Sequence, residues 1–473
     1  MAGISRSKLL KDFSSAVIQG NAAIFAGAGF SATAGFVDWK GLIRDLANEI
    51  GLDVEREYDM VALSQYYDNV HGRADVTRAI FDNFTRKAKL DDNHLILASL
   101  PISTYWTTNF DSLLEDGLRK CGKRVDVKSR NEDFQNTLRD RSAVVYKMHG
   151  DILHPDDTIL LKKEFEDYAS KHAVFHSALT TDLMNKVFLF LGFSFTDPNL
   201  NYVLSRLRYN QGGNNRVHFN ITRKVNRNDY KSDESFEYEL RKQELFVNDL
   251  EKNYNIQTYL VDEYYEINKI LKDLQRRNDR RTIYISGAAE EYLPWDPDTT
   301  KAFILELSAS IIKAGYKIVT GYGLGVGSLV IAGALEEIYK DEDGIVSDQI
   351  IMRPFPIGAD KTKVDTKRYR RDMIKNTGIT LFLLGNKKKD DGTIGLSDGM
   401  DEELNWSKEQ NNLLIPVGST GYKASEYYQE LVNNYPDPEY IRYEAEYKVI
   451  GDNTKSPAEI VEAIMNIIIE ANK

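Results

Sequence analysis

The sequence predicts an α/β protein made of two Rossmann-like domains, each a mostly parallel sheet covered by helices on both faces. The chain has 473 residues, which is enough for two or three domains of ~150 residues. Two apolar strands, at residues 22–25 and 282–285, run directly into glycine turns, as the first strand of a nucleotide-binding sheet does. Apolar strand segments then alternate with helical segments in both halves, the pattern of parallel sheets.

The elements follow one another in this alternating order. In the first half we expect strands at residues 22–25, 102–107, 143–148, 187–193 and 217–221, and helices at 39–50, 111–120 and 162–168. In the second half we expect strands at residues 282–285, 317–319, 349–352, 380–384 and 413–417, and helices at 301–314 and 328–339. Residues 275–281 are polar and lack apolar periodicity, which predicts a boundary near Asn278. The predicted domains are residues 1–278 and 279–473.

Composition excludes several classes of function. Lys and Arg number 61 against 72 Asp and Glu, giving a net charge of −11, so non-specific binding to nucleic acid or to an anionic membrane is not expected. Cys121 is the single cysteine, which excludes an internal disulfide and a multi-cysteine zinc site. Neither a signal peptide nor a membrane span is visible, because the most apolar run, residues 187–195, is too short. We expect a cytoplasmic protein.

Four polar clusters in the first half each follow a predicted strand. They lie at residues 27–39, which begin Gly-Ala-Gly, at 107–111 (Thr-Thr-Asn-Phe-Asp), at 147–151 (Lys-Met-His-Gly-Asp) and at 192–198 (Gly-Phe-Ser-Phe-Thr-Asp-Pro). Parallel strands bring their carboxyl ends to one edge of a sheet, where such folds bind ligands. Glycine turns before a helix suit a pyrophosphate, because backbone amides can approach it.

These four clusters, in this order, resemble the sirtuin family over roughly residues 15–230. The resemblance implies that NAD+ is a substrate and not a hydride carrier. It further implies that Asn109 holds the ribose hydroxyls or the attacking water, and that His149 acts as a general base, work that suits an imidazole. The other residues expected to bind NAD+ are Gly27, Ala28, Gly29, Ser31, Asp38, Asp111, Gly192 and Ser194.

One departure from the family changes the expected reaction. Protein-deacylating sirtuins carry a zinc module of two Cys-x-x-Cys pairs, and this chain has one cysteine. We therefore expect no zinc and no other cofactor. Water is then the simplest nucleophile, so the predicted products are ADP-ribose and nicotinamide. Three alternatives remain open: an NAD-dependent protein deacylase, a non-catalytic nucleotide sensor, and a phosphoribohydrolase centred on the second half.

The second half carries a different set of motifs. Residues 320–328 place glycines at alternate positions before a helix, and arginines at 368–371 supply cations for a phosphate. These motifs resemble the SLOG nucleotide-binding superfamily, although the glycine motif near Gly399 is degenerate, which favours binding over hydrolysis. The residues expected to bind an effector are Gly287, Ala288, Gly323, Leu324, Arg370, Arg371, Lys387, Gly399 and Glu403.

A sirtuin-like half followed by a SLOG-like half resembles the effector NADases of the Thoeris anti-phage defence system. The resemblance implies that a TIR-domain partner makes a cyclic ADP-ribose isomer, which binds the carboxy-terminal domain. The activated NADase then depletes cellular NAD+. It also implies a homo-oligomer, a tetramer in that family. Which isomer binds, and which of Arg370 and Arg371 contacts it, stay open.

Overall fold

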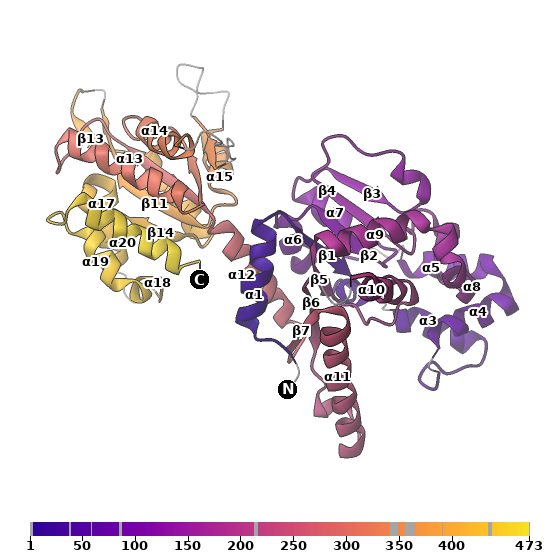
Figure 1. Cartoon of the computed structure of the whole chain (residues 1–473). Helices are drawn as coiled ribbons and strands as arrows, with labels where there is room; N and C mark the ends of the chain where they lie inside the picture. Colours follow the sequence, from indigo (N-terminus) through magenta and orange to yellow (C-terminus); the bar gives the residue numbers. More distant parts are fainter. Residues whose placement is uncertain are drawn as a thin grey trace. The chain divides into compact units, whose positions relative to one another are not determined.

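The computed structural model describes residues 3–36, 39–57, 59–84, 88–211, 216–340, 349–354, 365–389, 391–433 and 438–472. The chain forms two compact units, unit 1 (Met1–Gln275) and unit 2 (Arg276–Lys473). Each unit contains one parallel sheet flanked by helices, which confirms the predicted fold class (Figure 1). Asn278 lies inside helix α12 (Glu266–Asp279), so the polar segment at the expected boundary is helical.

Unit 1 is built on a seven-stranded sheet. Its strands are β1 (Ala22–Ala26), β2 (Thr104–Thr107), β3 (Val125–Lys128), β4 (Ala143–Lys147), β5 (Val187–Leu191), β6 (His218–Arg223) and β7 (Ile256–Val261). They run in the order β3-β4-β2-β1-β5-β6-β7, and every neighbouring pair is parallel. The chain places β2, β4 and β3 on one side of β1, and β5, β6 and β7 on its other side, so the strand order reverses between β1 and β5. A parallel sheet opens a crevice at such a point.

Side-chain alternation along β1 explains why helices cover both faces of this sheet. Ile24 packs with α1 and α12 on one face, and Phe25 packs with α9 and α10 on the other, as the two-residue period of a strand requires. The helices of unit 1 are α1 (Arg6–Ile18), α2 (Ala28–Ala32), α3 (Trp39–Glu49), α4 (Met60–His71), α5 (Arg73–Phe84), α6 (Asp92–Ser99), α7 (Leu113–Lys120), α8 (Lys162–Lys171), α9 (Ala173–Asn185), α10 (Pro198–Gln211), α11 (Asp233–Tyr254) and α12.

Unit 2 repeats the plan with five parallel strands in the order β10-β9-β8-β11-β14. They are β8 (Thr282–Ala288), β9 (Lys317–Thr320), β10 (Ile350–Met352), β11 (Ile379–Leu384) and β14 (Leu413–Pro416), and a hairpin of β12 (Asn386–Lys388) and β13 (Ile394–Leu396) is added. The helices are α13 (Pro297–Lys313), α14 (Gly327–Ile338), α15 (Thr366–Ile374), α16 (Gly399–Glu409), α17 (Tyr422–Asn433), α18 (Pro438–Arg442), α19 (Glu444–Gly451) and α20 (Pro457–Glu470). The strand order reverses here between β8 and β11.

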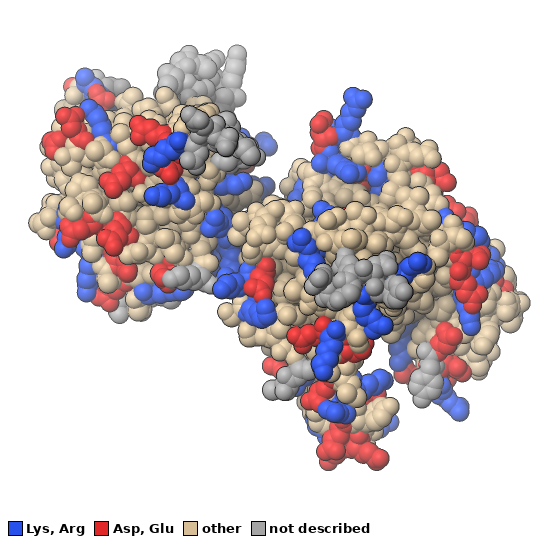
Figure 2. All heavy atoms as spheres, viewed as in Figure 1, with Lys and Arg blue, Asp and Glu red and all other residues tan. Residues whose placement is uncertain are grey.

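Charges of both signs occur on the face of the molecule that Figure 2 shows. Figure 2 shows acidic and basic side chains interspersed over the visible face of each unit. Within the described ranges, none of the helices combines the length and the apolar character that crossing a bilayer requires.

Candidate active site

A cavity of about 850 Å³ opens in unit 1 at the carboxyl ends of the strands. It spans the point where the strand order reverses. Eight residues predicted from the sequence line it: Ala28, Gly29, Ser31, Asn109, Asp111, His149, Gly192 and Ser194. Gly27 is not among the lining residues, although its carbonyl accepts Nδ2–H of Asn109, and Asp38 lies outside the described residues. The four clusters expected at one edge of the sheet are thus brought together.

Glycines make the wall between the loops that follow β1 and β5. The amide of Gly29 donates to the carbonyl of Gly192 (3.0 Å). A Cβ on Gly192 would lie 2.1 Å from the nitrogen of Phe30, and the φ of +61° at Gly192 disfavours other residues. A Cβ on Gly27 would lie 2.5 Å from the carbonyl oxygen of Gly192. Backbone therefore meets backbone where these two loops approach each other, and larger residues do not fit at Gly27 and Gly192.

Asn109 is held in place by three hydrogen bonds. Its Nδ2 donates to the carbonyl of Gly27 (3.1 Å) and to Oγ of Ser31 (2.9 Å), and its backbone amide donates to Oγ1 of Thr107 (3.0 Å). The Oδ1 atom of Asn109 is buried and has no hydrogen-bond partner among the described residues. A buried acceptor without a partner costs ~1–3 kcal/mol, so this oxygen suits a ligand hydroxyl or a water.

Asp111 occupies the same loop and has two different oxygens. Oδ1 accepts the backbone N–H of Leu113 (3.0 Å) at the start of α7. Oδ2 is buried without a hydrogen-bond partner in the described part of the chain. Asp111 can therefore cap the start of α7 through one oxygen and contact a ligand through the other.

His149 follows β4 and is 3% exposed. Its ring stands edge-on to Phe165, with centroids 5.1 Å apart. Its Nε2 lies 2.9 Å from Oδ2 of Asp197, although neither ring nitrogen makes a well-aligned hydrogen bond within the described ranges. Because imidazole accepts and donates protons near neutral pH, His149 can serve as a base at this wall of the cavity.

Asp197 is a site residue to which sequence reasoning assigned no role. It precedes Pro198 at the start of α10, and its Oδ1 accepts the N–H of Leu200 (2.8 Å). Burial alone would raise its pKa, but the His149 ring and the backbone N–H groups of α10 hold the pKa below the usual range for Asp. The carboxylate therefore stays charged. A helix cap is the ordinary interpretation of Asp before Pro, and only the folded chain reveals the contact with His149.

Lys147, two residues before His149, is fully buried. Its Nζ donates to the carbonyls of Phe110 (3.0 Å) and Asp111 (2.7 Å), and it forms ion pairs with Glu115 (3.0 Å) and Asp151 (2.6 Å). Burial alone would lower the pKa of Lys147, but the two carboxylates outweigh it and raise the pKa above the usual value. One internal cation thus ties the Asn109 loop to the His149 loop.

Residues beyond the four predicted clusters also line the cavity. They include Ile221 and Thr222 of β6 and the aromatic residue Tyr264, which is 53% exposed. Lys40 and Lys162 also line the cavity, together with the carboxylates of Asp59 and Glu166, and Lys40 pairs with Glu55 (2.6 Å). Lysines at such a wall can contact a phosphate as point charges.

In unit 2, the structure brings together several of the predicted effector residues. Oε2 of Glu403 accepts Oγ–H of Ser286 (2.6 Å), at the end of β8. Nη1 of Arg370 donates to Glu402 (2.6 Å), and Nε lies 3.6 Å from Oε1 of Glu403. A Cβ on Gly399 would lie 2.9 Å from Nη2 of Arg370. Burial raises the pKa of Glu403, although Ser286 and Arg370 oppose this effect.

The other predicted effector residues make separate contacts. The amide of Ala289, which follows Gly287 and Ala288, donates to the carbonyl of Leu324 (2.7 Å). A Cβ on Gly323 would lie 2.0 Å from the carbonyl oxygen of Gly287. Lys387 pairs with Asp398 (2.6 Å), next to Gly399. Arg371, by contrast, lies over the ring of Trp406, 5.1 Å from its centroid.

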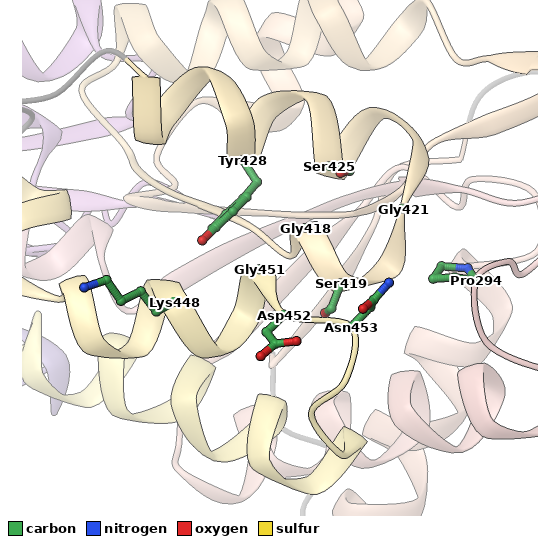
Figure 3. A pocket seen from close by; sticks show the side chains of 10 residues that line it. All are labelled: Pro294, Gly418, Ser419, Gly421, Ser425, Tyr428, Lys448, Gly451, Asp452 and Asn453. Atoms are coloured by element: carbon green, nitrogen blue, oxygen red, sulfur yellow. The ribbon is translucent and has the colours of Figure 1, made fainter.

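A second cavity, of about 480 Å³, lies elsewhere in unit 2. Figure 3 shows its polar lining, which includes Ser419, Tyr428, Lys448 and Asp452. None of the predicted effector residues lines it.

Comparison with known proteins gives two family matches and several full-length relatives. A SIR2-like domain model matches residues 103–259, and a model of the Sir2- and TIR-associating SLOG family matches residues 266–471. The chain is 44% identical over 463 residues to the NAD(+) hydrolase ThsA of Bacillus cereus (strain MSX-D12), covering 98% of this chain and 96% of that protein. The chain belongs to the ThsA family. The chain is also 43% identical to the NAD(+) hydrolase ThsA of Cytobacillus dafuensis, over 97% of this chain and 95% of that protein. It is 41% identical to the NAD(+) hydrolase ThsA of Acinetobacter baumannii (strain 532279), over 95% of this chain and 96% of that protein.

Membership of the ThsA family confirms the resemblance drawn from the motifs, in both halves and in their order. The SIR2-like match includes Asn109 and His149, and the SLOG match includes Arg370 and Glu403. The ThsA match therefore covers both of the sites described above.

Proposed function

We propose that this chain hydrolyses NAD+ to ADP-ribose and nicotinamide in anti-phage defence, and that a cyclic ADP-ribose bound to unit 2 activates it. The observation that carries the proposal is the placement of Asn109 and His149 on one cavity, beside glycine loops at the reversal of strand order. Its relatives in the ThsA family are named as NAD(+) hydrolases, which supports the same reaction.

The reaction breaks the glycosidic bond between the ribose C1′ and the nicotinamide nitrogen. The bonding electron pair leaves with nicotinamide, so the positive charge moves to the ribose as an oxocarbenium-like state. Water then adds to C1′ and releases one proton. The open Oδ1 of Asn109 accepts a hydrogen bond from that water or from a ribose hydroxyl, and His149 accepts the proton. Lys40 and Lys162 lie on the cavity wall and suit the pyrophosphate.

For unit 2, the supporting observation is the cluster of Arg370, Gly399 and Glu403 at the end of β8. Arg370 offers donors to a phosphate once a ligand competes with Glu402, and Glu403 offers an acceptor to a ribose hydroxyl. A ligand that activates must bind the active state more tightly than the resting state. Supply of the ligand by a TIR-domain partner, and assembly into a tetramer, are part of the same proposal and rest on the family resemblance.

The test is nicotinamide release from NAD+ by the full chain, measured by chromatography with and without added cyclic ADP-ribose. We expect release that rises with the cyclic nucleotide. His149→Ala and Asn109→Ala should each remove most turnover, because general-base catalysis supplies ~10²–10⁴-fold. Near-parental nicotinamide release from both variants would refute the assignment. An acyl-peptide substrate run in parallel tests the deacylase alternative.

A further inference from the structure

We propose that Asp197 is a positioning residue for NAD+ cleavage, acting through His149. This inference rests on the proposed function and adds to it a residue that neither the motifs nor the family resemblance assigned. The two oxygens of Asp197 have separate tasks. Oδ1 accepts the N–H of Leu200 at 2.8 Å, and Oδ2 lies 2.9 Å from Nε2 of His149.

The hydrogen bond to Oδ1 of Asp197 also fixes the direction of Oδ2. Because Oδ1 is bound to the backbone at the start of α10, the carboxylate cannot rotate freely, and Oδ2 keeps its direction toward the imidazole. The start of a helix also stabilises a negative charge. Asp197 is therefore an anchored anion, set on an element that packs against the sheet through Leu200 and Val203.

Among the described residues, Asp197 carries the charged group nearest to His149. Phe165 stands edge-on to the ring at 5.1 Å, and the ring of Tyr168 lies 6.5 Å away. The hydroxyl of Tyr168 is occupied, because it donates to the carbonyl of Met148 (2.9 Å). His172, beyond Tyr168, has its pKa lowered by burial and by His149, so it does not compete as a cation.

The chemical consequence follows from the proton that His149 accepts. When a water or a hydroxyl gives its proton to the imidazole, the ring becomes a cation in a largely buried wall. Asp197 lies 2.9 Å from Nε2, and in this water-poor wall its attraction for the cation is stronger than the same pair would have in bulk water. Asp197 thus stabilises the ring as charge develops, without touching the substrate carbon.

Asp197→Asn separates this role from helix capping, because Asn caps a helix as well as Asp does but carries no charge. We expect kcat to fall about 10- to 100-fold, less than the ~10²–10⁴-fold that the base itself supplies. KM for NAD+ should stay within about threefold, and the melting temperature should stay near that of the parent chain. A residue with only a structural role would leave kcat unchanged in a variant that keeps the cap.

Asp182→Asn is the matched control. Asp182 is another largely buried carboxylate of unit 1, and its Oδ2 accepts Nε1–H of Trp106 at 2.9 Å. Among the described residues, no hydrogen bond or ion pair joins it to His149. We expect its kcat to stay within about twofold of the parent, measured at a temperature where all variants are folded.

A double-substitution cycle decides whether Asp197 acts through His149. In the His149→Ala background, Asp197→Asn should cause no further loss of residual turnover, because the group it serves is absent. Parental kcat in Asp197→Asn, or an equal further loss in the His149→Ala background, would overturn the inference. A parent chain that releases no nicotinamide would instead refute the proposed function, so the two failures are distinguishable.

Discussion

Replacing Lys147 with methionine tests how the Asn109 loop and the His149 loop are held together. The substitution keeps a long unbranched side chain but removes a cation that contacts two carbonyls and pairs with Glu115 and Asp151. Removing one partner of a buried ion pair costs ~3–5 kcal/mol, because the other charge stays buried and uncompensated. We expect the free energy of unfolding of unit 1 to fall by about that amount at pH 7.5.

The loss should be smaller in acid. Burial raises the pKa of Glu115 even beside Lys147, and without the cation Glu115 takes up a proton more readily. A carboxyl whose native pKa is raised favours the native state when it is protonated, so the cost of Lys147→Met should shrink as pH falls toward 5. Adding Glu115→Gln to Lys147→Met should recover part of the stability at pH 7.5 for the same reason.

The assay is urea unfolding at pH 7.5 and pH 5, followed by tryptophan fluorescence; Trp106, fully buried beside Tyr146, reports on unit 1. Turnover of NAD+ is measured on the same samples well below the melting temperature. We expect kcat to fall about 10- to 100-fold, since a displacement of ~1 Å at reacting groups has this effect. A loss of stability under ~1 kcal/mol, with the same value at both pH values, would refute the reasoning about this cation.

Four further outcomes are expected. Arg370→Ala should weaken the binding of cyclic ADP-ribose about 10- to 100-fold, measured by calorimetry, in line with a buried charged contact. Arg371→Ala should weaken binding less. A larger loss of affinity in Arg371→Ala than in Arg370→Ala would contradict the arrangement around Glu403. Tyr264→Ala should raise KM for NAD+ about 5- to 100-fold with little change in kcat, if its ring stacks on a base; an unchanged KM would exclude that contact. Turnover should survive prolonged chelation, whereas activity lost to a chelator and restored by zinc would reveal an unrecognised metal site. Burial lowers the pKa of His218 to about 3, so His218 is neutral in the native state. Below pH ~6.5 this side chain takes up a proton in the unfolded chain but not in the native chain, so the free energy of unfolding should fall by ~2 kcal/mol between pH 7.5 and 5. That loss should shrink in His218→Gln.

The sequence predicted best where function depends on local order along the chain. The turns that follow β1 and β5 are each specified by a strand and a glycine in sequence, so Gly27, Gly29 and Gly192 could be placed without knowledge of the fold. Asn109 and His149 follow strands in the same way. Parallel strands then bring these loops to one edge of the sheet, whatever the details of the packing.

Elements without an apolar run were missed. Strand β3 is four residues long and contains Asp126 and Lys128, whose buried side chains pair at 3.0 Å. Such a segment has the composition of a surface loop, and only its pairing with β4 identifies it as a strand. The β12–β13 hairpin was missed as well, and so was strand β7, although its sequence, Ile-Gln-Thr-Tyr-Leu-Val, is largely apolar.

Contacts between distant residues could not be predicted. Asp197 has a correct local interpretation as a helix cap, and its second contact depends on the loop after β4. Arg370 and Arg371 are equivalent in sequence, but adjacent positions on a helix point in different directions, and only packing decides which one meets Glu403.

Helix α12 has a practical consequence for anyone who expresses the two units separately. The SLOG-family match begins at residue 266, where α12 begins, so a gene fragment divided there would look natural. Yet Ile267, Ile270, Leu271 and Leu274 all belong to the apolar core of unit 1. Each buried side chain of this kind contributes ~1.5–3 kcal/mol, more in sum than the stability of many whole domains. A sirtuin-like fragment that stops before Glu266 should therefore aggregate or fail to fold. A lack of NAD+ turnover by that fragment would then give no information on whether unit 2 regulates unit 1.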